Sequence, residues 1–232
     1  MMIKKSVQGV SAWMVAGMLG VASVGPVQAA GFGLPSLPSL GGGAAQAGSD
    51  VGSQVGAFLK SVQISNELVT RSAVLLLQAV SSKERGAELQ KQLDTLGKIS
   101  DPKEKDAESA KLVASVNAEL ATQQQSAQTQ EGLKQASSAQ KVAMGKGLFN
   151  LALGMLKLKD AKDSGQGIVA GVGRAPLDAP KVVPVKDALP VLSSLMDNGK
   201  AILDSGMALA KTAGIQPKLP TSSGTAPVDA EM

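Results

Sequence analysis

Few residues of this chain could perform chemistry by their type and spacing. Ser138 and Lys141 fit the S-x-x-K pattern of serine acyl-enzymes, and the run Lys211-Thr212-Ala213-Gly214 is similar to the K-T-G element of those enzymes. The second element is wrongly spaced, and the sequence lacks an S-D-N element. We therefore expect no serine acyl-enzyme.

Two other motifs fail for lack of context. The run Gly165 to Ala170 matches the loose dinucleotide fingerprint G-x-G-x-x-A, but it follows a charged helical stretch and not a strand. Asp160 and Asp163 precede Gly165, but they lack the alternating oxygen ligands of a calcium-binding EF-hand loop. Neither a dinucleotide site nor a calcium site is expected.

The composition excludes most of the remaining chemistry. The chain has 232 residues and no Cys or His. Disulfides, zinc fingers, His-ligated metals, iron–sulfur clusters and Ser-His-Asp triads each need one of these side chains. The carboxylates of Asp101, Glu104, Asp106 and Glu108 lie together, but in a charged, solvated segment where nothing would tune a catalytic acid. We expect no catalytic residue, no cofactor and no metal ion.

The first 29 residues predict a secretory signal peptide. Lys4 and Lys5 precede an apolar stretch from Val7 to Val24, and small residues end the segment at Ala29. Cleavage between Ala29 and Ala30 would place the mature chain in the periplasm or outside the cell. The alternative is an uncleaved membrane anchor, because the apolar stretch approaches the length of a spanning helix.

Cleavage changes the charge and aromatic content. Losing two of the 23 basic residues leaves 21 against 19 acidic ones, a net charge of only +2. Trp13 is lost as well, so three Phe remain as the only aromatic residues. Nucleic-acid binding needs a basic patch, and stacking on bases needs several aromatic side chains. We therefore expect no nucleic-acid partner.

Residues 30–50 are rich in Gly, Ala, Ser and Pro and predict a flexible leader, or a docking peptide for a groove. Residues 51–98 contain no proline and predict one long helix or two nearly collinear ones, with apolar residues repeating every seven positions. Between the apolar rows, a row of small residues would let another helix approach closely: Ser65, Ser72, Ala79 and Gly86.

A helix boundary is predicted near residues 99–102. Asp101 can cap a helix that has Pro102 in its first position and Glu104 in its first turn. The chain then runs for about sixty residues without proline. Together, residues 51–162 predict a long antiparallel helical hairpin. In this arrangement Val74 to Leu77 would face a polar stretch, so we expect the last helix or a second chain to cover them.

Residues 142–158 carry a wide apolar arc with a narrow polar strip of Lys146, Asn150 and Lys157. Such a segment is either the most buried helix of a bundle or a helix that lies in a bilayer interface. The side chains that would face a membrane or a partner are Leu148, Phe149, Leu151, Met155 and Leu156.

The rest of the chain predicts a connector, one helix and a tail. Residues 163–186 are rich in Gly and Pro, and residues 187–214 show helical spacing with Asp187 as N-cap and Gly214 as C-cap. Gly199 and Gly206 lie seven apart on the apolar stripe of this helix. Residues 215–232 are rich in Pro, Ser and Thr and predict a disordered tail.

The sequence therefore predicts an all-α protein: a long antiparallel hairpin with a C-terminal helix packed on it. We expect a non-enzymatic, exported scaffold or adaptor that associates through its helices with itself or with an envelope partner. The alternative is a membrane-active or lipid-binding protein that uses residues 142–158.

Overall fold

A computed structural model describes residues 50–172 and 176–229 of the chain. Contacts divide the chain into two units, residues 1–30 and 31–232, and every described residue belongs to the second. The predicted signal peptide and nearly all of the predicted leader lie outside the described residues, as do residues 173–175 of the predicted connector.

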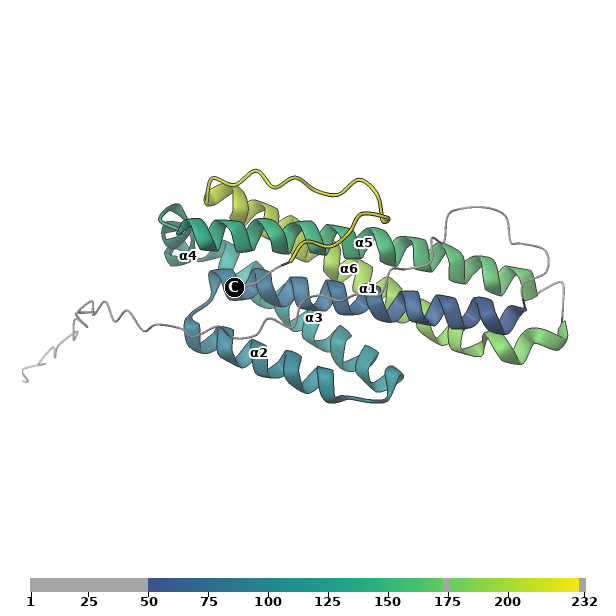
Figure 1. Ribbon diagram of the computed structural model, residues 1–232. Helices are drawn as coiled ribbons and strands as arrows, with labels where there is room; N and C mark the ends of the chain where they lie inside the picture. Colours follow the sequence, from purple (N-terminus) through teal and green to yellow (C-terminus); the bar gives the residue numbers. More distant parts are fainter. Residues whose placement is uncertain (1–49, 173–175, 230–232) are drawn as a thin grey trace, which may run out of the picture. The chain divides into compact units, whose positions relative to one another are not determined.

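The described residues form helices and no strand, which confirms the all-α prediction (Figure 1). In chain order the elements are α1 (Val51–Val80), α2 (Lys83–Lys98), α3 (Pro102–Gln125), α4 (Ala127–Lys134), α5 (Ser138–Val172), the 3-10 helix η1 (Pro176–Val182) and α6 (Val183–Thr212).

Four of these helices, α1, α3, α5 and α6, enclose the main core. α1 lies between α5 and α3, and α6 contacts α1, α3 and α5. α5 runs antiparallel to the other three, whereas α2 packs outside this group against α1 and α3. The largest fully buried side chains include Phe58, Leu68, Leu76, Leu77, Leu120, Met144, Leu148, Leu151, Leu158 and Leu192.

The predicted rod over residues 51–98 is interrupted after Val80. Ser81 is extended, and the side chain of Ser82 caps α2 by accepting a hydrogen bond from the backbone N–H of Arg85 at 3.3 Å. α2 then folds back beside α1, so the prediction of one helix or two collinear helices was wrong. The reversal turns Leu89 and Leu96 of α2 inward.

The boundary near residues 99–102 is confirmed. Asp101 accepts a hydrogen bond from the backbone N–H of Glu104 at 2.8 Å, and Pro102 begins α3. The chain beyond it does not continue as one arm of a hairpin. Ser126 ends α3 and caps α4, while Ser137 and Gln140 form a reciprocal capping box that begins α5. The antiparallel partner of α1 is therefore α5.

Three glycines of α5 allow α1 to approach closely. A methyl group at Gly154 would lie 2.7 Å from Cγ2 of Val69 and 3.2 Å from its backbone nitrogen. Gly147 meets Leu76 in the same way, and Gly165 meets the ring of Phe58. α5 continues through Gly165 to Val172, so the predicted connector from residue 163 is shorter than expected.

The last helix begins earlier than predicted. α6 begins at Val183 with Pro184 in its first turn, and Pro190 lies inside it. Asp187 is not its N-cap, because the helix has already begun; its carboxylate pairs instead with Lys103 of α3 at 3.0 Å. Gly214 follows the helix with a φ of 72°, the left-handed conformation typical of a residue after a helix C-terminus.

The expectation that the apolar segment of α1 needs a cover is confirmed, and the cover lies within the chain. Val74, Leu76 and Leu77 are buried. A methyl group at Gly206 of α6 would lie 3.5 Å from Cδ1 of Leu76, so the last helix reaches this segment.

The prediction of a disordered tail over residues 215–232 was wrong for residues 215–229, and residues 230–232 lie outside the described residues. Residues 215–229, which we name the C-terminal strap, lie along α5 and hydrogen bond to it (Figure 1). The composition favours an irregular backbone, which is observed, but polar side chains of α5 bind that backbone and hold it in place.

The close packing of α1 on α5 predicts that Gly154→Ala destabilises the fold. The added methyl group meets backbone atoms of Val69, which cannot move aside as a side chain can, so we expect a loss of about 1–3 kcal/mol in the free energy of unfolding. Gly145→Ala on the same helix is the control, because nothing lies within 4 Å of the added group. It should stabilise by about 1 kcal/mol through helix propensity. Urea titration measures both values, and equal effects would contradict the packing argument.

Candidate functional site

The motifs that could suggest catalysis lie in ordinary helical positions. Ser138 is exposed at the first turn of α5. Gly165 to Ala170 is continuous helix and forms no phosphate-binding loop. Within residues 50–172 and 176–229, no group of three or more acidic side chains is placed to hold a metal ion.

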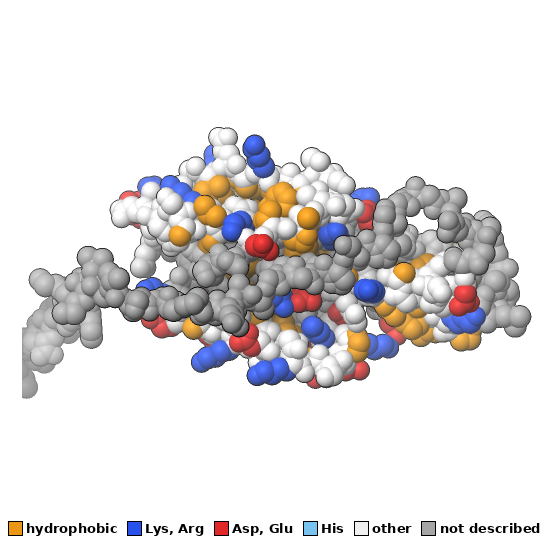
Figure 2. Space-filling view, in the orientation of Figure 1, with side chains coloured by type: hydrophobic (Ala, Val, Ile, Leu, Met, Phe, Trp, Pro, Cys, Tyr) orange, Lys and Arg blue, Asp and Glu red, His pale blue; other side chains and the backbone are white. Residues whose placement is uncertain are grey.

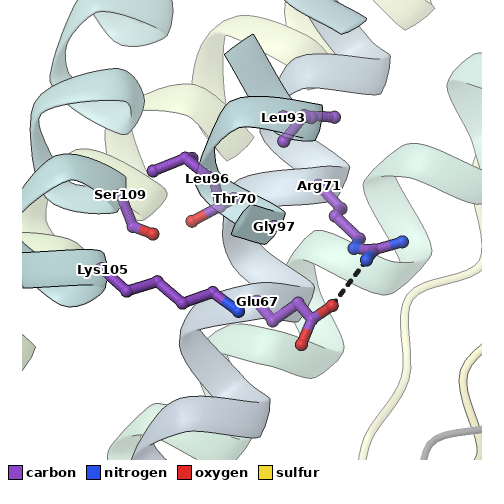
Figure 3. A pocket seen from close by; sticks show the side chains of 8 residues that line it. All are labelled: Glu67, Thr70, Arg71, Leu93, Leu96, Gly97, Lys105 and Ser109. Atoms are coloured by element: carbon purple, nitrogen blue, oxygen red, sulfur yellow. Dashed lines mark ion pairs between the residues drawn. The ribbon is translucent and has the colours of Figure 1, made fainter. Parts of the chain in front are cut away.

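A small pocket lies where α1, α2 and α3 meet (Figure 3). Its volume of about 30 Å³ is room for about one water molecule. The carboxylate of Glu67 pairs with Arg71 at 2.6 Å, and Lys105 reaches toward Glu67 from α3. The full lining is Glu67, Thr70, Arg71, Leu93, Leu96, Gly97, Lys105 and Ser109. A pocket of this size cannot enclose a substrate.

Beside this pocket a short polar chain links α1 to α3. Asn66 donates a hydrogen bond to the Asp106 carboxylate at 2.7 Å and accepts one from the Thr70 hydroxyl at 3.2 Å. Asn66 and Thr70 are buried. Burial raises the pKa of Asp106, while the hydrogen bond from Asn66 and the charge of Lys105 oppose that shift. This arrangement fixes the register of two helices.

The best candidate for a binding site is the outer face of α5, where side chains hold the main chain of the strap. The amide of Asn150 donates to the carbonyl of Val228 at 2.7 Å and accepts from its N–H at 2.9 Å. Lys157 donates to the carbonyl of Ser223 at 2.6 Å. The hydroxyl of Ser223 also donates to Asp160.

One apolar side chain completes this face. Leu153 is fully buried, yet it does not belong to the main core cluster. It lies three residues after Asn150 and four before Lys157, so the three side chains share one face of the helix. A buried apolar side chain therefore lies between the two polar contacts with the strap. We call Asn150, Leu153, Lys157 and Asp160 the strap seat.

Burial also affects the charges of the strap seat. It lowers the pKa of Lys157, while the neighbouring charge of Asp160 opposes the shift. Asn150 is only 1% exposed with the strap in place, and both polar atoms of its amide are paired with Val228. The strap therefore supplies the hydrogen-bond partners that this amide would otherwise find in water. Around it, hydrophobic side chains reach the surface among lysines (Figure 2).

Most of the small residues that were predicted to allow close helix packing are buried inside the bundle. Ser72 faces Gly147 of α5, and Ser65 is buried with its hydroxyl bonded to the carbonyl of Ser61 at 2.7 Å. Ala79 is buried as well. Gly86 lies apart from this row on α2, where its carbonyl accepts a hydrogen bond from Gln78 at 2.9 Å.

Gly199 and Gly206 belong to the α6 side of the same packing. Gly199 lies against Met155 of α5, and Gly206 lies against Leu148. Both glycines are buried. Ser72, Gly199 and Gly206 therefore lie at contacts between helices of one chain.

The residues predicted to face a membrane or a partner are divided between the core and the surface. Leu148 and Leu151 are fully buried, whereas Phe149, Met155 and Leu156 are half-buried. Of the helices within the described ranges, none has the length and apolar character that a membrane span requires.

Sequence reasoning found the polar strip of α5 but not its purpose. The sequence predicts only that Asn150 and Lys157 belong to a polar strip, whereas both side chains bind the strap. A buried Asn inside an apolar helix is the signal that could have indicated a bound main chain, because such an amide needs a donor and an acceptor. The identity of the bound segment, more than 60 residues away, has no local signal.

The raised pKa of Asp106 predicts a pH dependence of stability. The unfolded chain loses the proton of Asp106 at its ordinary pKa of 3.8, whereas the folded chain keeps this proton to a higher pH. The free energy of unfolding therefore falls as the pH rises through the unfolded and then the folded pKa of Asp106. Asp106→Asn keeps an oxygen for Asn66 and removes the titration. We expect the variant to unfold at a higher temperature than the natural chain at neutral pH, and at the same temperature below pH 3.8.

Thermal unfolding followed by circular dichroism measures this difference. Asp204→Asn removes the same charge from an exposed position on α6 and is the control. An advantage of Asp106→Asn that persists unchanged into acid would show that burial of the carboxylate is not the cause.

Comparisons of the chain with protein-family models, with curated proteins and with solved structures found no match.

Proposed function

We propose that this chain is a non-enzymatic, exported adaptor whose helical bundle presents α5 to an extended segment of a polypeptide. The observation that carries the proposal is the pair of hydrogen bonds between Asn150 and Val228. An amide that meets both the N–H and the C=O of one residue recognises main chain, whatever the side chain at that position.

The rest of the strap seat supports the same function. Lys157 also binds a backbone carbonyl, and the hydroxyl of Ser223 is the one side-chain group held there by a hydrogen bond. An extended segment with a small polar residue at one position would satisfy these contacts. Polypeptide recognition that combines main-chain hydrogen bonds with few side-chain requirements is a common mode of docking.

The bundle is suited to support such a seat. α5 contacts both α1 and α6, and its inward face is buried along much of its length. A binding surface on a well-packed helix is held more precisely than one on a loop. Export rests on the predicted signal peptide, and the near-neutral mature charge fits a partner that is itself a protein.

A peptide-binding experiment tests this proposal. The chain is ended after Pro217, which removes the gripped part of the strap, and a fluorescent peptide of residues 218–232 is added. We expect saturable binding by fluorescence anisotropy, weakened about tenfold by Asn150→Leu, because the loss of two hydrogen bonds in a buried seat is worth about 1.4 kcal/mol or more.

Asn198→Leu on α6 is the matched control and should leave the affinity unchanged, because Asn198 bonds to Asn117 and not to the strap. Circular dichroism establishes that each variant keeps its helices. A folded protein that does not bind the peptide, or that binds it equally with Leu at position 150, would exclude the strap seat as a binding site.

Vesicles separate the proposal from the membrane-active alternative. The intact chain should remain in the supernatant when lipid vesicles are sedimented, because Leu148 and Leu151 lie in the core. Sedimentation with vesicles that Phe149→Asp abolishes would support the alternative, since Phe149 is the half-buried aromatic side chain of the same segment.

A further inference from the structure

We propose that the segment recognised by the strap seat in solution includes the strap of a second copy, so that two chains exchange residues 215–229. This inference rests on the proposed function and names the partner. Residues 223–228 satisfy Asn150, Lys157 and Asp160 in the structure, and every copy carries both the segment and the seat.

Few contacts hold the strap to its own bundle. Beyond Ile215, whose N–H bonds to the carbonyl of Ala210, the strap is gripped at Ser223 and Val228. Its intervening residues are exposed or half-buried. Exchange with a second copy would break these contacts and re-form the same ones, which is why swapping of a terminal element is a low-cost route to a dimer.

The linker between α6 and the grip at Lys157 is longer than the distance that it spans. Gly206 lies beside Leu148 and Gly199 beside Met155, so the end of α6 lies level with the first turn of α5. The grip at Lys157 is then about 24 Å further along α5, at 1.5 Å per residue. The ten residues from Gly214 to Ser223 can span about 33 Å when extended.

The strap therefore leaves α6 as an arm and not as a tight turn. Pro217 and Pro220 restrict this arm to extended conformations. It reverses only at its far end, where the N–H of Thr225 bonds to the carbonyl of Ser222 at 3.2 Å. An arm of this length can reach the α5 of a copy that lies alongside.

Acidic neighbours offset part of the positive charge near the seat. Lys159 pairs with Asp163 at 3.0 Å, and Asp160 lies beside Lys157. The resulting dimer would have two-fold symmetry, because each copy gives one strap and receives one.

The experiment uses the full chain in two labelled populations. The chain has no cysteine, so Ala226→Cys places a donor dye on the strap of one population, and Lys159→Cys places an acceptor on α5 of the other. Because a strap tethered to its own bundle competes at an effective concentration of the order of 1 mM, the populations are mixed at about 1 mM. We expect energy transfer that Asn150→Leu abolishes and Asn198→Leu leaves in place.

Shortening the linker gives an independent readout. Deleting residues 216–219 leaves six residues, which reach about 20 Å and cannot seat the strap on its own α5. Short hinge segments favour exchange. Light scattering should show that the shortened chain is half dimeric at a concentration at least tenfold lower than the intact chain. Asn150→Leu in the shortened chain should restore the monomer.

The outcomes separate the two proposals. Without energy transfer between populations, and with a shortened chain that remains monomeric, exchange is overturned. If the isolated peptide still binds in that case, the strap seat remains a binding site for another protein. Energy transfer that persists with Leu at position 150 would also overturn exchange, because the copies would then be associating through another surface.

Discussion

The close approach of α5 to α1 is the constraint on which the rest of the structure depends. Gly147, Gly154 and Gly165 remove side chains from one line of α5, and Leu76, Val69 and Phe58 of α1 fill the space. This contact fixes which way α5 faces. Once its glycine line meets α1, Leu148 and Met155 must point to α6, where Gly206 and Gly199 receive them. The side of α5 that carries Asn150 and Lys157 is then left for the strap.

The same constraint explains how far sequence reasoning could go. Helix periodicity and caps are local, so the all-α class, the boundary at Asp101 and the end of α6 near Gly214 could be predicted. The seven-residue spacing of small residues also indicated close helix packing. It could not say which helix fills each seam, because the partners of a glycine are decided by the fold as a whole.

The errors have a common physical cause. Single Ser residues at positions 82, 126 and 137 begin or end helices without Pro or Gly, and their side-chain hydrogen bonds interrupt what periodicity alone presents as long rods. Conversely, Gly165 was assigned to a Gly-rich connector, yet it lies inside α5, where it packs against Phe58. The strap was missed because its order comes from distant side chains and not from its own composition.

The outer position of α2 has a consequence for how the molecule opens. Only Leu89 and Leu96 of this helix are buried, and the bidentate contact of Arg85 with Glu119 ties it to α3. A segment with so few apolar contacts opens at a lower free energy than the core of a fold. In native-state hydrogen exchange, we expect the amides of α2 to exchange before those of the four-helix core, through a local opening that leaves the core intact.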